Sequence, residues 1–180
     1  DAPISNFLGN TSPNNWYGLR NRNIGARMGF KYFAHDSEHT LLPGDLNIDR
    51  TGPFPAGDTD VSKSSPQYIF KQLAANAEFR LKVADRIQRY FFNSGLLTPQ
   101  VNRERLLRRK AQIDRAVVGE SARWGDAKRS TPFTRADWEN AVNAVLNNFL
   151  PQRTTIVLTQ LRADNLYPTT AAPAFNQYGG

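Results

Sequence analysis

Both histidines of the chain lie in one short acidic segment, residues 35–39 (HDSEH). The string matches His-x-x-Glu-His, in which two histidines one helical turn apart bind zinc and the glutamate acts as base. That chemistry requires a helix, whereas the alternating residues before the segment and Pro43-Gly44 after it favour a strand and a turn. A zinc hydrolase that uses His35, Glu38 and His39 stays open as an alternative, with the local pattern against it.

A second interpretation takes Asp36 as a carboxylate at the end of a strand, where it could hold a hard cation and the phosphate oxygens bound to that cation. Asn14 or Asn15, in the segment ahead of the strand, could supply a second oxygen ligand. A purely structural interpretation also stays open, because Asp36 and Glu38 could cap a turn and asparagines are common turn residues.

The element that must position Asp36 is a short strand predicted over residues 28–34 by period-two alternation. Met28, Phe30, Tyr32 and Ala34 would share one face, with Gly29, Lys31 and Phe33 on the other. The rest of the first 65 residues is rich in Gly, Pro, Asn and Asp and predicts loops around this one strand, including a long irregular connection over residues 43–65.

From Ser65 onward the pattern is helical. Start signals at Ser65-Pro66, Asn76, Thr98-Pro99 and Thr134 predict four helices, and the helical period resumes after a restart at Pro151. Thr134 and Asp137 predict a capping box, and Asn165 predicts a left-handed stop. Residues 123–126 (RWGD) indicate a packed, hydrogen-bonded corner with a structural role. We expect a mainly α fold with a small β element (α+β), as one domain over residues 1–167 with a linker-like tail at 168–180.

Composition excludes several classes of function. The chain has no cysteine, so disulfides, Cys-ligated zinc, iron–sulfur clusters and thiol catalysis are ruled out, and no apolar run approaches the length of about 20 residues that a membrane span needs. The formal net charge is +7, and residues 101–129 carry nine basic against four acidic side chains. Because acidic residues are interleaved there and no aromatic stacking set accompanies them, we expect a solvated helix face and no nucleic-acid partner.

Several segments, taken in order, resemble the CotH kinase family, whose members are similar to spore-coat protein H. They are residues 14–22 (NNWYGLRNR), 29–33 (GFKYF), 35–41 (HDSEHTL), 49–54 (DRTGPF), 76–80 (NAEFR), 120–126 (ESARWGD) and 166–168 (LYP). The resemblance spans nearly the whole chain. It implies the C-terminal lobe of an atypical protein-kinase-like fold that transfers phosphate from Mg-ATP to serine of a protein substrate, in a bacterial extracellular or cell-surface setting.

The resemblance also implies roles for individual residues. Asp36 matches the aspartate that binds the nucleotide's metal, Glu38 matches the second acidic position, and Asn14 and Asn15 match an asparagine-rich segment. Of these two asparagines, Asn15 is the expected metal or phosphate ligand. The family often carries a catalytic aspartate just before the asparagine pair, whereas residues 10–13 here are NTSP, so no catalytic residue is assigned.

The missing carboxylate and the short stretch ahead of the strand lead to two expectations. The chain is expected to be a fragment of a longer protein that lacks the nucleotide-covering lobe, and therefore to be inactive or a pseudokinase. A non-enzymatic structural module of a larger surface protein is the further alternative.

Overall fold

The computed structural model describes residues 15–23, 29–51 and 66–170 of the chain. These residues form a mainly helical structure with a two-stranded antiparallel sheet, as the α+β expectation requires. The elements are β1 (Trp16–Leu19), β2 (Lys31–Ala34), the 3₁₀ helix η1 (Pro43–Asp45), α2 (Pro66–Ala74), α3 (Ala77–Phe91), α4 (Pro99–Trp124), α5 (Arg135–Ala144), the π-helical turn η2 (Val145–Phe149) and α6 (Leu150–Ala163). None of the described helices combines the length and apolar character that a membrane span requires.

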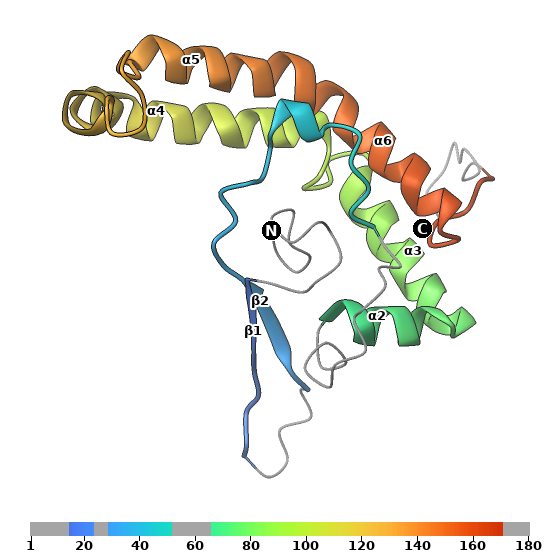
Figure 1. The fold of residues 1–180 in the computed structure, drawn as a ribbon. Coiled ribbons are helices and arrows are strands. Elements are labelled where there is room, and N and C mark those ends of the chain that lie inside the picture. The colour runs from blue at the N-terminus through green and yellow to red at the C-terminus, as the bar shows by residue number, and fades with distance from the viewer. Residues whose placement is uncertain (1–14, 24–28, 52–65, 171–180) are drawn as a thin grey trace.

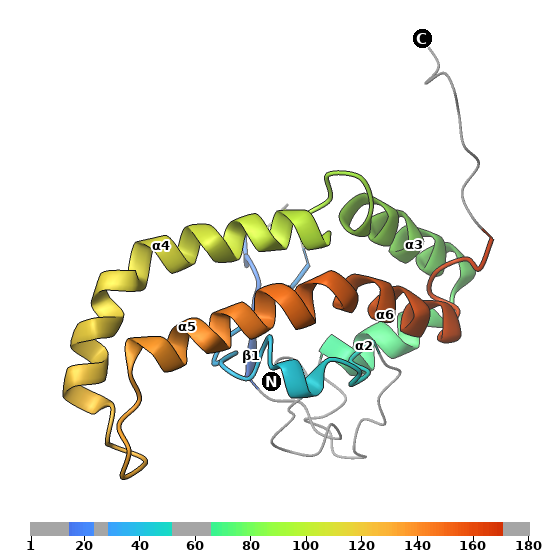
Figure 2. The same cartoon turned by 90° about the horizontal axis from the view of Figure 1, so that it is seen from above.

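The helices form an elongated body from which the hairpin projects. α4 lies alongside the continuous run of α5, η2 and α6, and α3 packs near the far end of that run (Figures 1 and 2). In Figure 1 the β1–β2 hairpin extends away from this helical layer, and the segment after β2 leads back to it through η1. The hairpin and the helices are therefore joined through the loop that follows Asp36.

The sheet corrects the prediction of a single strand. Trp16–Leu19 was expected to be a loop and is a strand, paired with β2 in the register Trp16↔Ala34 to Leu19↔Lys31. Within the predicted strand, Lys31–Ala34 is confirmed, residues 29 and 30 precede β2, and Met28 lies outside the described residues. All four residues of β2 are exposed, so the alternation does not mark a buried face. Aromatic pairs across the strands, such as Tyr17 stacked on Phe33 at 5.3 Å between ring centroids, stabilise the hairpin instead.

The predicted helix starts at Pro66, Asn76, Thr98 and Thr134 are confirmed, and two of them form side-chain caps. Ser65, the predicted cap of α2, lies outside the described residues. The Asn76 side chain accepts a hydrogen bond from the Phe79 amide at 3.1 Å, and Thr134 and Asp137 form the reciprocal capping box. Thr98 precedes α4 as predicted, but its hydroxyl donates to the Gly95 carbonyl at 2.8 Å and caps no helical amide. At the other end of the helical region, Asn165 adopts the predicted left-handed conformation, with φ of 56°.

The helix predicted after Pro151 is confirmed as α6, Leu150–Ala163, with Pro151 in its first turn, but the chain does not break before it. The helix runs on from α5 into α6 through η2, where the Leu150 amide donates to the Val145 carbonyl five residues earlier. Proline lacks an amide hydrogen and its ring collides with the carbonyl four residues back. A π turn directly before Pro151 displaces that carbonyl, so the helix passes through the proline without breaking.

Two small clusters of buried side chains lie on this long helix. The first contains Ile87, Leu158, Leu161 and Leu166, and joins α3 to α6 and the turn after it. The second contains Leu146, Phe149 and Leu150, against which Leu106 of α4 and Leu46 after η1 pack. α4 itself has no fully buried residue.

The segment after η1, predicted as part of a long irregular connection, is held against α6 by side-chain hydrogen bonds. Arg153 donates to the carbonyls of Leu46 at 2.5 Å and Ile48 at 2.9 Å. The Thr51 hydroxyl donates to the Asp164 carboxylate at 2.6 Å. Burial lowers the pKa of Arg153 from its ordinary value, although a guanidinium remains charged. The polypeptide that links the hairpin to the helices is thus fixed in place as far as residue 51.

Candidate functional site

The hairpin brings together two of the residues that were predicted to bind a metal. Trp16 pairs with Ala34, so Asn15 and His35 face each other one step beyond the sheet. The His35 amide donates to the Asn15 carbonyl at 2.9 Å, and the Asn15 side-chain amide donates to the Asp36 carbonyl at 3.0 Å. Strand pairing therefore places Asn15 beside Asp36, although 21 positions separate them in the sequence.

Both residues adopt the left-handed backbone conformation, with φ of 51° at Asn15 and 50° at Asp36. Asparagine and aspartate tolerate this conformation better than other non-glycine residues do. Asn15 directly precedes β1 and Asp36 lies two residues after the end of β2, so both left-handed residues lie at the same end of the hairpin. Asp36 is exposed to solvent. The residue types that suit metal coordination are thus also the types that this backbone requires.

Residues 35–40 form a turn. The Thr40 amide and hydroxyl both donate to the Ser37 carbonyl, at 3.2 and 2.9 Å, and the Ser37 hydroxyl donates to the His35 carbonyl at 3.3 Å. A zinc site of the His-x-x-Glu-His type needs both histidines on one helical face, and these residues supply no helix. No group of three histidine or acidic side chains able to hold a metal occurs among the described residues.

The Glu38 side chain contacts His39 and not the Asn15–Asp36 pair. Its carboxylate lies 3.6 Å from Nε2 of His39, its neighbour in the turn. Within the described residues, no hydrogen bond or ion pair joins Glu38 to Asn15 or Asp36. Asn14, the remaining predicted ligand, lies outside the described residues.

An exposed row of rings leads to this end of the hairpin and was not singled out from the sequence. Tyr17 stacks on Phe33, and its ring centroid lies 5.9 Å from that of His35, the residue before Asp36. Tyr17 and Phe33 are 47% and 41% exposed, so these rings could stack on a planar ligand. The signal for this row was the cross-strand pairing, which cannot be seen until Trp16–Leu19 is recognised as a strand.

The hairpin end can contribute two kinds of oxygen to a hard cation: the Asp36 carboxylate and the Asn15 amide. Mg²⁺ is usually held by one or two protein oxygens, with water and substrate phosphates completing its octahedral shell. Two donors at an exposed turn match that pattern better than they match Zn²⁺, which takes three or four protein ligands including nitrogen or sulfur.

Comparison with known proteins finds no matching family model, no matching curated protein and no matching solved structure. The function of the chain is therefore inferred from its own residues and geometry, together with the resemblance carried by its sequence motifs.

Proposed function

We propose that this chain is part of a CotH-type secreted or surface protein kinase and corresponds to the C-terminal lobe of that kinase-like fold. In this proposal the end of the β1–β2 hairpin holds the magnesium ion of Mg-ATP. Asp36 is the metal ligand and Asn15 the second oxygen donor. The observation that carries the proposal is the contact between Asn15 and Asp36, which unites two residues chosen from separate sequence segments.

The surroundings of the pair support a nucleotide over a bare phosphate. The exposed rings of Tyr17 and Phe33 lie on the same hairpin as the two candidate metal ligands, and an aromatic face can stack on a nucleobase. Glu38 would act at a distance from the metal, through water or the protein substrate, since its carboxylate lies beside His39.

Transfer of the γ-phosphoryl group to a serine also requires a group that accepts the hydroxyl proton. Residues 10–13 (NTSP), where the family often carries an aspartate, contain no carboxylate. We therefore expect this chain to bind Mg-ATP and to transfer phosphate slowly or not at all. A bacterial, extracellular or cell-surface setting forms part of the same proposal.

Calorimetric titration of ATP into the full chain, with and without Mg²⁺, tests this function. We expect binding that requires Mg²⁺ and that weakens at least about tenfold in Asp36→Asn and Asn15→Gly, as losses of metal-holding groups do. Both replacements tolerate the left-handed backbone, so they remove the ligand and keep the backbone conformation. Asn15→Gly also removes the hydrogen bond to the Asp36 carbonyl, whereas Asp36→Asn keeps it and is the cleaner test of the metal role. Asp85→Asn, at an exposed carboxylate on α3, serves as the control and should bind as the native chain does.

Three results would contradict the proposal. Binding that persists without Mg²⁺, or that Asp36→Asn leaves unchanged, would remove the metal role of Asp36. Stoichiometric zinc in the purified protein, lost in His35→Ala and His39→Ala, would favour the hydrolase. Absence of both nucleotide and zinc would favour the structural module.

A further inference from the structure

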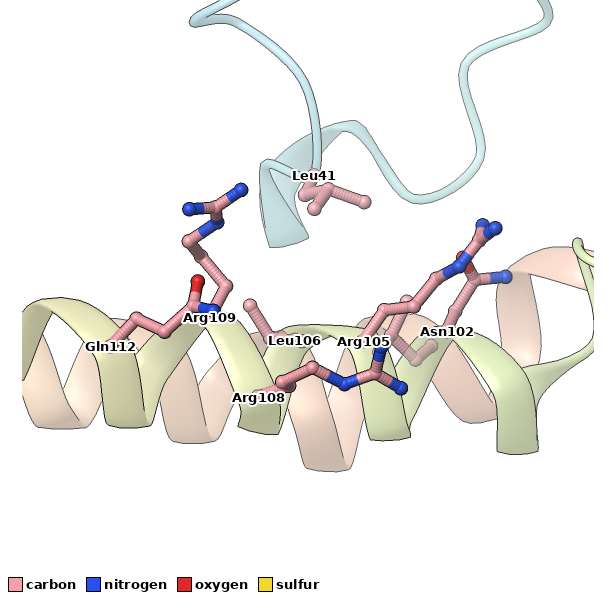
Figure 3. Close-up of a pocket in the computed structure, with 8 residues that line it drawn as sticks. Leu41, Asn102, Arg105, Leu106, Arg108, Arg109 and Gln112 are labelled. Carbon is pink, nitrogen blue, oxygen red and sulfur yellow. The ribbon is translucent and has the colours of Figure 1, made fainter.

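An open pocket of about 530 Å³ lies between α4 and the loop that follows the hairpin. Leu41 lines it from the loop, Leu150 from the start of α6, and Leu106 from α4. Figure 3 shows the side chains of Arg105 and Arg109 rising from α4 on either side of Leu106, toward the loop that carries Leu41. Arg108 completes the basic side of the pocket.

The three arginines of this pocket have no carboxylate partner among the described residues. The hydrogen bond that the structure records for Arg105 runs from Nη1 to the Leu96 carbonyl at 3.3 Å, and neither Arg108 nor Arg109 forms an ion pair in the described part of the chain. Positions 105, 108 and 109 are three and four residues apart on one helix, where like charges repel. The helix therefore carries an unfavourable arrangement at this face.

Two neighbouring cations at the contact between α4 and α5 are, by contrast, paired with carboxylates. Arg135 lies 2.8 Å from Asp114 and 3.0 Å from Glu139, and Lys110 lies 3.6 Å and 3.5 Å from the same two carboxylates. Lys110 of α4 and Arg135 of α5 are thus matched by acidic groups, whereas the three arginines at the pocket have no carboxylate partner in the described part of the chain.

Leu41 adds an independent feature. Its φ is 61°, in the left-handed region that leucine rarely adopts and where its Cβ is crowded by the following carbonyl. Its side chain is 43% exposed and lines the pocket, so the strain is not offset by burial in the core. Strained backbone of this kind concentrates at binding sites. Together with Leu106 and Leu150, Leu41 gives the pocket an apolar centre between charged edges.

We propose that this pocket binds an acidic peptide segment in which carboxylates flank an aliphatic side chain. The guanidinium groups of Arg105, Arg108 and Arg109 present forked donors that match carboxylates, and a pocket lined by one sign of charge attracts the opposite sign. The apolar centre receives the aliphatic group. None of the described residues that line this pocket is aromatic, so they offer a nucleobase nothing to stack on, which argues against a nucleotide or nucleic acid.

The test uses the full chain and a fluorescein-labelled peptide that repeats Asp-Leu-Glu, followed by fluorescence anisotropy. A peptide that repeats Asn-Leu-Gln removes the charge, and one that repeats Asp-Ser-Glu removes the aliphatic group. We expect the first peptide to bind best and its affinity to fall as added salt shortens the screening length from about 8 Å to about 3 Å.

Two variants of equal net charge separate the pocket from general attraction. Combined Arg105→Gln, Arg108→Gln and Arg109→Gln should weaken binding at least about tenfold, because each lost charge pair at a docking surface contributes. Combined Lys82→Gln, Arg86→Gln and Arg115→Gln, at exposed positions outside the pocket, should change it less than about twofold. Equal losses in the two variants would overturn the proposal.

Leu41→Asn tests the apolar centre without threatening the fold, since asparagine is favoured at this φ. It should reduce the preference for Asp-Leu-Glu over Asp-Ser-Glu, and an unchanged preference would overturn the apolar part of the proposal. Displacement of the peptide by tripolyphosphate or a single-stranded oligonucleotide at lower concentrations than by unlabelled peptide would assign the pocket to those polyanions instead. Asp36→Asn should leave peptide binding unchanged, so failure of the nucleotide site and failure of this pocket are distinguishable.

Discussion

Gly125, the residue after α4, occupies a position where no side chain fits. An added Cβ would lie 2.5 Å from the carbonyl oxygens of both Ser121 and Phe133. The Phe133 amide donates to the Gly125 carbonyl at 2.8 Å, which closes the turn between α4 and α5. The packed corner predicted at residues 123–126 is confirmed at this glycine, while Trp124 is 54% exposed, with the Arg123 guanidinium 5.0 Å from the centroid of its ring.

Replacement of Gly125 by alanine should therefore destabilise the protein by about 2 kcal/mol, because the helix end and the turn must move apart. Gly119→Ala, six residues earlier in the same helix, should stabilise it by about 0.5–1 kcal/mol, since an added Cβ there meets nothing within 4 Å. Urea unfolding monitored by circular dichroism measures both. Equal changes in the free energy of unfolding would contradict this prediction, because they would show that the turn accommodates the added Cβ without loss of stability.

Among the elements, α4 depends on charge and ring contacts more than on burial. It has no fully buried residue, and it meets α5 through the cluster of Lys110, Asp114, Arg135 and Glu139. The Lys110 ammonium also lies 4.9 Å from the centroid of the Trp138 ring, a favourable cation–π contact. Pairing of α4 with α5 should therefore respond to pH and salt more strongly than the packing of α3 on α6.

The Arg135 guanidinium, hydrogen-bonded to Asp114, holds the pKa of that carboxyl below its usual range. A depressed pKa means that ionised Asp114 stabilises the native state above the unfolded-state pKa of about 3.9, and that this contribution is lost as pH falls through the lower native-state value. Asp114→Asn should thus be less stable than the native chain at neutral pH, with the difference shrinking below about pH 4.

Urea midpoints measured across a series of pH values check this expectation. The control is Asp85→Asn on α3, at a carboxylate that pairs with no cation among residues 15–23, 29–51 and 66–170, and its curve should stay parallel to that of the native chain. If the loss of stability in Asp114→Asn stays constant down to pH 2, the carboxylate contributes through its shape and not through its charge.

In the molecule as a whole, the continuous helix from α5 to α6 links the two buried clusters and holds the segment after η1. Both buried clusters lie on it, one around Leu146 and the other around Leu161. The segment that links it to the hairpin is held by Arg153 of the same helix. Unfolding of either cluster would remove support from the other, so the helical body should unfold as one unit.

Leu146→Ala and Leu161→Ala should each lower stability by about 3 kcal/mol, as truncation of buried leucines does. Both should shift one common transition, recorded by circular dichroism and by tryptophan fluorescence. Leu107→Ala, at a position that is 41% exposed, should change stability by less than about 1 kcal/mol. Two separate transitions, each sensitive to one variant, would contradict a single cooperative body.

Local features of this protein could be predicted from its sequence. Asn76, Thr134 and Asn165 mark helix ends, and each acts through residues within one turn of itself, so its effect is independent of distant parts of the chain. The mainly helical character follows from the same local signals. The candidate ligands Asn15 and Asp36 were likewise identified by residue type.

Tertiary structure alone decided how these pieces meet. The sequence of β1 (WYGL) has no alternation of apolar and polar residues, and the strand forms through its pairing with β2, which places Asn15 beside Asp36. The helix continues through Pro151 because the π turn η2 accommodates the proline ring. α4 contacts both α5, before this turn, and α6, after it. The arginines of α4 were visible in the sequence, but the pocket arises from Leu41 and Leu150, which lie far from them along the chain. Contacts between distant residues depend on the folded path of the whole chain, and no window of neighbouring residues contains that information.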